Sequence, residues 1–379
     1  MNIGIVTPRY PPTHAGGGEI SAQLLAGQLL EHADVDTVTV FSFDGNRTET
    51  IEGVPVRRLS DVPQYPYTLP NEIAYRKLKA FELECDILHG YNMHLHPTVG
   101  RISAARGIPS VATLNAYPLI DWGDIGINPS TQRRIYERTL LRLERPRLKR
   151  HMRNVNRFLP LSSAVERVYR ANGFADSEFQ VVPNMLDPAF AVPDRLNDTD
   201  EKDGLVNLLY VGYLRDSKGV RHLIDAMDLL PSTYILQIVG DGPTRASLEA
   251  RADRRETGGR IQFTGKVPYD EVTRAYATAD VFVHPGVWPE PFGRTILEAM
   301  QAGLPVVATD VGGPGETVPQ QDLRCPPGDP SALAVAIERA VENRDAIGAE
   351  NESYVYETFH PSEVVPQFLE TYRTVLADY

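Results

Sequence analysis

Cysteine and long apolar runs are both scarce in this sequence. The two cysteines among 379 residues, Cys85 and Cys325, stand far apart, which is typical of a reducing compartment rather than of a disulfide-built protein. No apolar run approaches the roughly 20 residues that a transmembrane helix needs. The opening residues, MNIGIVTPRYPP, lack the basic and apolar regions of a signal peptide. These absences favour a cytoplasmic protein.

Positive charge is also in short supply. The chain carries 38 lysines and arginines, mostly arginine, against 50 acidic residues, so its net charge is −12. Proteins that bind nucleic acid usually concentrate positive charge, and this balance argues against such a partner. Hydrophobic residues make up 42% of the chain, enough for substantial cores, and the length suggests two domains or one large one.

Short apolar runs alternate with amphipathic segments along most of the chain. One series of predicted strands begins with NIGIVTP and ends with FQVVPN, and a second begins with VNLLYVGYL. This alternation predicts an α/β fold with two doubly wound parallel sheets covered by helices on both faces. The predicted boundaries are an N-terminal Rossmann-like domain at 1–186, a polar, proline-containing linker at 187–204, and a second Rossmann-like domain at 205–359.

A glycine cluster lies between the first predicted strand and the first predicted helix. In TPRYPPTHAGGGE, residues 16–18 would expose backbone N–H groups at a helix N-terminus, which favours an anion. A flexible turn would explain the glycines equally well. A dinucleotide-binding fingerprint would stand closer to its strand, although Asp44 could act as its ribose-binding acid. An NAD-linked dehydrogenase or epimerase is therefore retained as an alternative.

Two glutamates eight residues apart, Glu290 and Glu298, frame a turn and the start of a predicted helix in PEPFGRTILEAMQAG. An acid that complements a helix dipole would explain one of them, but not both. Carboxylates bind sugar hydroxyls through short charge-assisted hydrogen bonds, and the N–H groups near Gly293 suit a phosphate. Lys218 and Arg215, in VGYLRDSKG, add positive charge after another strand. Together these groups suit a nucleotide-sugar.

The stretch PEPFGRTILEAMQAGLPVVATDVGGPGE closely resembles the E-x7-E region of family 4 retaining glycosyltransferases, which have the GT-B fold. The resemblance extends over nearly the whole chain. PPTHAGGGE is similar to the family's N-terminal glycine loop, VVPNMLD to its interdomain P-N-G-x-D, and VGYLRDSKG to its G-R-L-x-x-x-K-G. GDGP, FTGKVP and GGPGE are also similar to family motifs. The order of the set makes the resemblance specific.

The resemblance implies a role for each matching residue. Glu298 would hold the donor ribose, Glu290 would contact the transferred sugar and support charge at the reacting centre, and Lys218 would neutralise the diphosphate. The implied donor contacts are completed by the backbone N–H groups of Phe292, Gly293, Arg294 and Thr295, by Gly17 and Gly18 from the other domain, and by the backbone around Val267, which would read the base.

Two residues depart from the family pattern. Tyr213 stands where arginine is usual, so Arg215 or Arg294 would have to supply the missing charge. Asn115 ends a strand that often ends in histidine; its amide can orient a sugar hydroxyl but cannot take a proton, a step in which the leaving phosphate is thought to assist. These departures keep a second alternative open, a non-catalytic protein that binds sugar nucleotides.

The implied function is transfer of a sugar, with retained configuration, from a nucleotide-sugar to a glycan or lipid-linked acceptor. No metal or other cofactor is implied, because fixed cations and helix dipoles would stabilise the leaving diphosphate. The segment 360–379 would form a helix that crosses back onto the N-terminal domain.

Two further clusters stand outside these motifs. His89, His94 and His96 resemble a metal site, but spacing alone does not show convergence. His89 is expected to line the cleft instead, and His284, which ends a strand just before the E-x7-E loop, has the better case for a contact. Residues 133–157 hold ten arginines and lysines and two acids. They are read either as a solvated helix pair broken at Pro146 or as a surface that docks onto anionic lipid at the inner face of the cell membrane or onto a lipid-phosphate acceptor.

Overall fold

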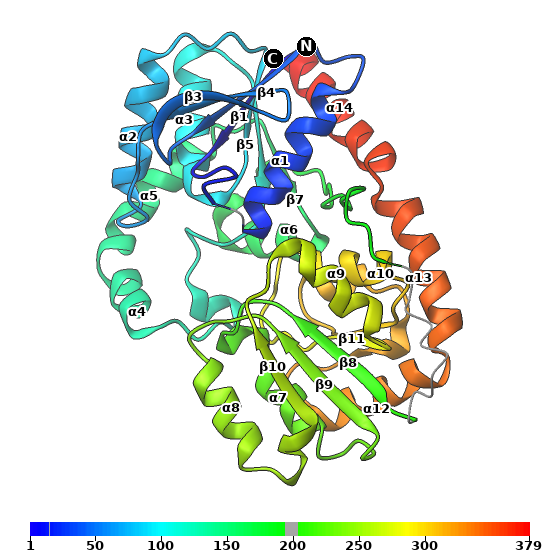
Figure 1. Ribbon diagram of the computed structural model, residues 1–379. Helices are drawn as coiled ribbons and strands as arrows, with labels where there is room; N and C mark the ends of the chain where they lie inside the picture. The colour runs from blue at the N-terminus through cyan, green and yellow to red at the C-terminus, as the bar shows by residue number, and fades with distance from the viewer. Residues whose placement is uncertain (15, 194–203) are drawn as a thin grey trace. The chain divides into compact units, whose positions relative to one another are not determined.

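The computed structural model describes residues 1–14, 16–193 and 204–379 (Figure 1). The chain divides into two compact units: unit 1 comprises Met1–Met185 and Pro361–Tyr379, and unit 2 comprises Leu186–His360. Most of the predicted linker, residues 194–203, lies outside the described residues. Among the residues that are described, no helix is both long enough and apolar enough to span a bilayer.

Unit 1 contains a seven-stranded sheet with the order β3-β4-β2-β1-β5-β6-β7. Its pairs are parallel except for the β3–β4 hairpin, which the sequence patterns did not predict. FQVVPN, predicted as the last strand, instead runs beside β7 through backbone hydrogen bonds and one isolated bridge. The strands are β1 (Asn2–Thr7), β2 (Thr37–Ser42), β3 (Asn46–Ile51), β4 (Val54–Leu59), β5 (Ile87–Gly90), β6 (Ser110–Leu114) and β7 (Arg157–Pro160).

The helices of unit 1 connect and cover these strands. Ser162, one of two serines predicted to cap a helix, accepts a hydrogen bond from the backbone N–H of Val165 at the start of α6. The helices are α1 (Gly17–Leu30), α2 (Thr68–Ala80), α3 (His96–Arg106), α4 (Thr131–Arg138), α5 (Leu140–Met152), α6 (Ser163–Tyr169) and α14 (Pro361–Asp378), with short turns at Met93–Leu95, Trp122–Ile125 and Arg170–Phe174.

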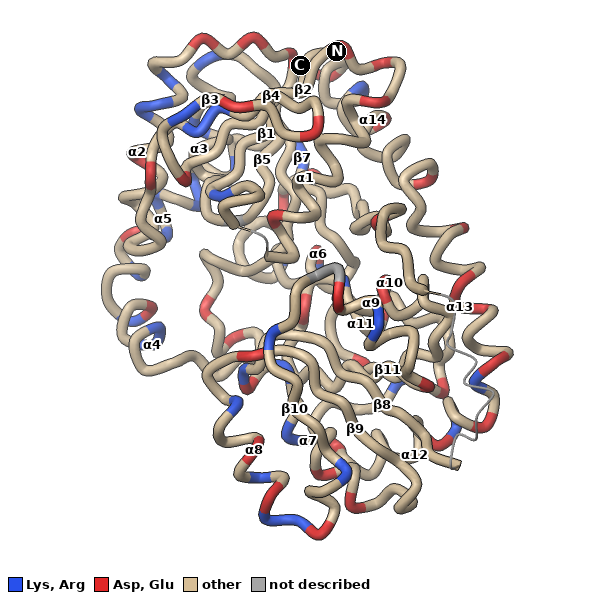
Figure 2. The backbone as a smooth tube through the Cα atoms, viewed as in Figure 1, with Lys and Arg blue, Asp and Glu red and all other residues tan. Residues whose placement is uncertain are grey.

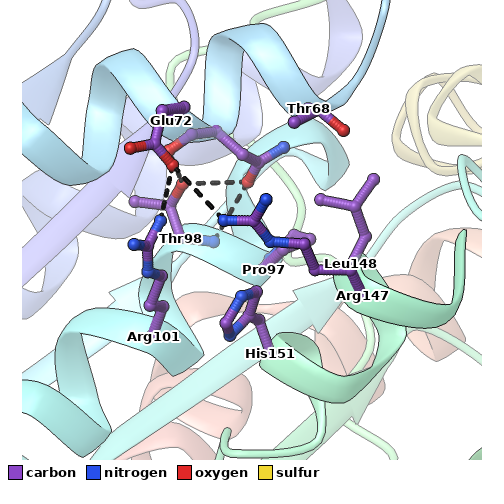
Figure 3. A pocket seen from close by; sticks show the side chains of 9 residues that line it. Thr68, Glu72, Pro97, Thr98, Arg101, Arg147, Leu148 and His151 are labelled. Carbon is purple, nitrogen blue, oxygen red and sulfur yellow. Dashed lines mark hydrogen bonds and ion pairs between the residues drawn. The ribbon is translucent and has the colours of Figure 1, made fainter. Parts of the chain in front are cut away.

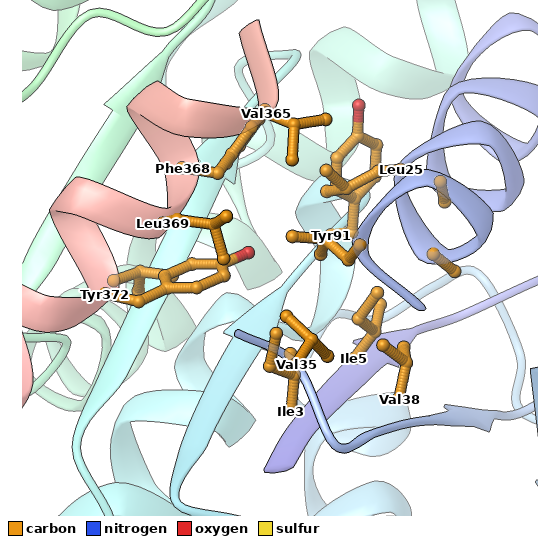
Figure 4. Close-up of a cluster of buried hydrophobic side chains, with 14 of the residues drawn as sticks. Ile3, Ile5, Leu25, Val35, Val38, Tyr91, Val365, Phe368, Leu369 and Tyr372 are labelled. Atoms are coloured by element: carbon orange, nitrogen blue, oxygen red, sulfur yellow. The ribbon is translucent and has the colours of Figure 1, made fainter. Parts of the chain in front are cut away.

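The C-terminal helix α14 completes the core of unit 1. Its apolar side chains, Val365, Phe368, Leu369 and Tyr372, belong to the same buried cluster as residues of β1, α1 and β2 (Figure 4). The last 19 residues of the chain therefore fold with its first half. Burial of this apolar surface is the main stabilising contribution that the segment makes.

His89 lies inside this core, so the prediction that it lines a cleft is wrong. Its side chain is fully buried in β5, where Nδ1 lies 2.7 Å from the Tyr372 hydroxyl and Nε2 lies 2.8 Å from the Thr113 hydroxyl. Burial lowers the pKa of His89 to about 3, so the ring is neutral. It ties the sheet to α14.

Unit 2 contains a six-stranded parallel sheet with the order β10-β9-β8-β11-β12-β13. The strands are β8 (Val206–Val211), β9 (Tyr234–Val239), β10 (Ile261–Gly265), β11 (Val281–His284), β12 (Val306–Thr309) and β13 (Arg324–Cys325). The helices are α7 (Val220–Ala226), α8 (Arg245–Asp253), α9 (Tyr269–Thr278), α10 (Arg294–Gln301), α11 (Gly313–Thr317), α12 (Pro330–Glu342) and α13 (Arg344–Phe359), with short turns at Asp216–Lys218, Glu256–Arg260 and Gln321–Leu323.

Candidate active site

The strand order of unit 2 places its main charged cluster at a point where the winding of the sheet reverses. The chain adds β9 and β10 on one side of β8, then β11, β12 and β13 on the other. In such sheets, ligands bind outside the carboxyl ends of the two strands that flank the reversal. Lys218 follows β8, His284 is the last residue of β11, and Glu290 lies in the loop after it.

These three side chains meet. The Lys218 Nζ lies 2.6 Å from each carboxylate oxygen of Glu290, and the His284 Nε2 lies 3.2 Å from Oε2. The Glu290 side chain is 15% exposed. Burial opposes ionisation of Glu290, but the Lys218 ammonium and the His284 ring outweigh it and hold the pKa of Glu290 well below its usual range. Glu290 is therefore an anion at physiological pH, and His284 is one of the groups that surround it.

Close backbone approach fixes this cluster. Gly219 has a φ of +68°, and a Cβ there would lie 1.8 Å from the Pro285 carbonyl oxygen, so only glycine lets the two loops touch. The Val287 N–H donates to the Ser217 carbonyl at 3.0 Å, and the Gly313 N–H donates to the Glu290 carbonyl at 2.7 Å. The loops after β8, β11 and β12 thus hold each other in place.

Glu298 lies within α10 and has partners of its own. The helix starts after Gly293, whose φ is +93°, and no side chain caps it. The Glu298 carboxylate accepts hydrogen bonds from the Tyr276 hydroxyl at 2.9 Å and from the Arg294 Nε at 3.3 Å. It is 5% exposed. Tyr276, on α9, was missed in the sequence because no motif marks it.

The remaining predicted donor residues of unit 2 are more dispersed. Phe292 is buried, Thr295 is half-buried in the first turn of α10, and Arg294 also lies 3.6 Å from an oxygen of Asp187. Val267 follows β10, the edge strand, which is separated from β8 by β9. Lys218, Glu290 and the start of α10 thus converge, whereas Val267 stands apart from them.

The two arginines proposed to replace the family's missing charge have partners other than Glu290. The Arg215 guanidinium instead lies 4.9 Å from the ring centroid of Tyr213, and both side chains are exposed. Arg294 faces Glu298 and Asp187. The positive charge beside Glu290 comes from Lys218.

We expect the Arg215→Ala variant to keep donor affinity and turnover within about two-fold of wild type, because exposed stacked charges contribute little. Isothermal titration with a nucleotide and steady-state kinetics would measure both. A loss of more than ten-fold in either would mean that Arg215 leaves Tyr213 when donor binds and serves as the missing arginine.

Unit 1 has a second candidate site at its own reversal, between β1 and β5. A Cβ on Gly18 would lie 2.3 Å from the Asn92 Oδ1, so glycine lets the Asn92 amide lie against the backbone in its present position. The Asn115 Nδ2 donates to that same oxygen at 2.6 Å, and the Asn92 Nδ2 lies 3.3 Å from the Thr7 hydroxyl. Asn92, which follows β5 with a φ of +59°, is a residue that sequence reasoning missed.

The loop before the glycines is held by a buried ion pair. Arg58 donates to the carbonyls of Tyr10, at 3.1 Å, and Pro11, at 2.7 Å, and lies 2.6 Å from the Asp44 carboxylate. Asp44 also accepts from the Tyr10 N–H at 3.0 Å. Asp44 therefore anchors this loop, and the dehydrogenase alternative loses the acid that it needed for ribose.

The histidines near β5 do not gather into a metal site. Across residues 1–14, 16–193 and 204–379, no group of three or more histidine, cysteine or acidic side chains is arranged to hold a metal ion. Burial lowers the pKa of His94 to about 4 and of His96 to about 3, so both rings are neutral.

Comparisons with known proteins agree with this architecture. The family model described as Glycosyltransferase Family 4 matches residues 15–190, and that of Glycosyl transferases group 1 matches residues 195–356. An uncharacterized glycosyltransferase of Methanocaldococcus jannaschii is 26% identical, with 99% of each chain covered. Sucrose-phosphate synthase from Thermosynechococcus elongatus superposes with a TM-score of 0.80 at 21% identity, covering 100% of both chains. Anabaena HepE in complex with UDP-glucose superposes at 0.73 and 20% identity, covering 99% of this chain and 100% of HepE. The chain belongs to glycosyltransferase family 4 and is a glycosyltransferase with the GT-B fold.

Proposed function

We propose that this glycosyltransferase uses a nucleoside-diphosphate sugar and transfers the sugar with retained configuration to a glycan or lipid-linked acceptor. The observation that carries the proposal is the meeting of Lys218, Glu290 and the start of α10 at one set of strand ends. Sugar transfer from a diphosphate separates charge: the leaving diphosphate gains negative charge and the sugar carbon gains positive charge. Lys218 and the start of α10 can stabilise the negative charge of the diphosphate, and Glu290 can stabilise the positive charge of the sugar carbon.

Lys218 would divide its interactions between Glu290 and the diphosphate. In the structure its ammonium contacts only the Glu290 carboxylate among described side chains. A bound diphosphate would draw part of this charge, while backbone N–H groups of residues 292–295 and the α10 dipole would take up more. Because these fixed groups can neutralise the leaving group, the proposed mechanism needs no metal.

Glu290 and Glu298 would take separate roles. Glu290, freed in part from Lys218, would face the transferred sugar and stabilise positive charge at the reacting carbon. Glu298 would accept hydrogen bonds from ribose hydroxyls, with Tyr276 and Arg294 orienting its carboxylate. In unit 1, we propose that Gly17 and Gly18 approach a phosphate and that Asn115, oriented by Asn92, contacts a sugar hydroxyl.

The relatives support the donor class without fixing the base. HepE has been solved with UDP-glucose, and another relative, 39% identical over a third of this chain, is named a GDP-mannose-dependent mannosyltransferase. A non-catalytic binder of sugar nucleotides is less favoured, because the paired charges around Glu290 are intact. We propose a cytoplasmic location on the ground of the low cysteine content, two residues in 379.

A thermal-stability panel with UDP-, GDP- and ADP-sugars tests the donor class. The true donor, at about 100 times its Kd, is expected to add about 2.7 kcal/mol of stability, because it binds only the folded chain. Donor hydrolysis or transfer should then follow with the same nucleotide. Stabilisation by NAD alone, or by none of these nucleotides, would contradict the proposal; binding without turnover would favour the non-catalytic alternative.

A further inference from the structure

The basic segment 133–157 separates into an inward-facing half and an outward-facing half. Arg133 is 6% exposed, pairs with Glu137 at 2.8 Å and lies 4.7 Å from the Trp122 ring centroid. Others reach backbone carbonyls or acids of unit 1. Arg145 forms an ion pair with Asp121, and Arg157 forms one with Asp378. Lys149 donates to the Asn172 carbonyl, and Arg153 donates to the Gly173 carbonyl. Half of the positive charge therefore serves the fold.

The other half is exposed along α4 and α5, among exposed apolar side chains. Leu143 is 78% exposed, Ile135 is 60% exposed and Leu140 is 50% exposed. Five exposed arginines accompany them along α4 and α5. Figure 2 marks the positions of basic residues on the backbone of these helices. We name this surface the α4–α5 face; it comprises Arg134, Ile135, Arg138, Leu140, Arg142, Leu143, Arg147 and Arg150.

Helix geometry explains why this surface is coherent. Leu140, Leu143, Arg147 and Arg150 follow the three- and four-residue spacing of one side of α5. The opposite side carries the buried Leu141, Leu148 and Met152. One side of α5 thus packs in the core of unit 1, and the exposed leucines do not contribute to that packing. Exposed apolar patches of this kind mark interaction sites.

The arginines of this surface have few internal counter-charges. Arg147 lies 3.8 Å from Glu72, which also binds Arg101 at 2.7 Å in a small hollow (Figure 3). That hollow supplies its own acid and suits no free anion. Within the described part of the chain, Arg138, Arg142 and Arg150 form no ion pair or side-chain hydrogen bond.

We propose that the α4–α5 face docks onto an anionic lipid surface. The chain as a whole has a net charge of −12, so the three exposed arginines without an ion pair among the described residues, Arg138, Arg142 and Arg150, point to an external anion. Exposed leucine and isoleucine between the arginines suit the boundary between headgroups and acyl chains. A nucleic acid or an acidic protein would match the arginines but leave these apolar side chains unused. The inference does not depend on the donor.

Vesicle sedimentation with the full chain tests this docking. We expect binding to phosphatidylcholine vesicles that contain phosphatidylglycerol, and little binding to phosphatidylcholine alone. Replacing Arg138 and Arg142 by glutamine should weaken binding roughly 30-fold, about five-fold for each arginine. Leu143→Glu should weaken vesicle binding about ten-fold or more, because a carboxylate would replace the apolar group that enters the lipid surface and would repel the anionic headgroups. Soluble-acceptor turnover should not change.

Matched controls come from unit 2. Leu229→Glu alters a leucine that is 54% exposed, and an Arg254→Gln, Arg274→Gln double variant removes two exposed arginines. Both should bind vesicles like wild type. The proposal is overturned if the charge of the lipid makes no difference at moderate salt, or if the α4–α5 variants match their controls. It is also overturned if Leu143→Glu converts a dimer to a monomer in sedimentation velocity, since a second copy would then cover this face.

Discussion

Replacing Glu290 by glutamine is expected to lower kcat about 100- to 1000-fold while changing nucleotide affinity little. The amide keeps the shape of the side chain but removes the negative charge that the proposed mechanism places beside the reacting carbon. Lys218 should remain folded in place, since its side chain is 19% exposed and reaches solvent. Steady-state kinetics with the donor found by the stability panel would measure kcat, and titration with the free nucleoside diphosphate would measure affinity.

Two control variants separate this effect from a general loss of charge. Asp225→Asn removes a carboxylate that is 18% exposed and pairs with two arginines in unit 2, and should leave kcat unchanged. Glu298→Gln should chiefly weaken nucleotide binding, because the amide no longer offers two acceptor oxygens to ribose. If Glu290→Gln weakened nucleotide affinity as much as Glu298→Gln, the proposed division of roles would be wrong.

The sequence predicted the main features of the fold because parallel strands have clear local signatures. Runs such as DVFVHPG and PVVATDVGG correspond to β11 and β12, and the helical pattern of RTILEAMQAG corresponds to α10. Family motifs then placed Lys218 and Glu290 after neighbouring strands. Their direct contact could not be predicted, since it depends on how the backbone of Gly219 approaches Pro285.

The segment 133–157 shows why side-chain burial was harder to predict. The apolar Ile135 is exposed, whereas the charged Arg133 is buried through Glu137 and an aromatic ring. Residue hydrophobicity alone predicts the reverse. The helix break expected at Pro146 is also wrong: it occurs at Thr139, and Pro146 lies inside α5. Leu141 and Leu148 anchor α5 on both sides of the proline, and this packing was not visible in local propensity.

Lys218→Met is expected to cost about 3 kcal/mol of stability at neutral pH and to weaken donor affinity on the order of 10- to 100-fold. The stability loss arises because Glu290 would remain buried without its main cation. Burial raises the pKa of Glu290 in the folded state, but Lys218 and His284 lower it by more. The wild-type pair therefore stabilises the protein at pH values above the usual carboxyl pKa. That stabilisation declines as the pH falls below about 4, because the Glu290 carboxylate of the unfolded chain then takes up a proton while the folded one stays ionised until its lowered pKa is reached. The difference between variant and wild type should therefore shrink in acid, which urea unfolding at several pH values would measure.

A double-mutant cycle distinguishes this buried charge effect from simple loss of packing. Adding Glu290→Gln to Lys218→Met removes the unpaired carboxylate, so stability should return to within about 1 kcal/mol of wild type, while activity stays absent. The corresponding cycle at the more exposed Arg251–Asp225 pair should show a coupling of at most about 1 kcal/mol. If the double variant were as unstable as Lys218→Met alone, the lysine stem rather than its charge would stabilise the loops. Restored stability without donor binding is the expected result. It would mean that Lys218 is kept at these strand ends to bind the substrate, and that Glu290 offsets the cost of burying the lysine charge until the diphosphate binds.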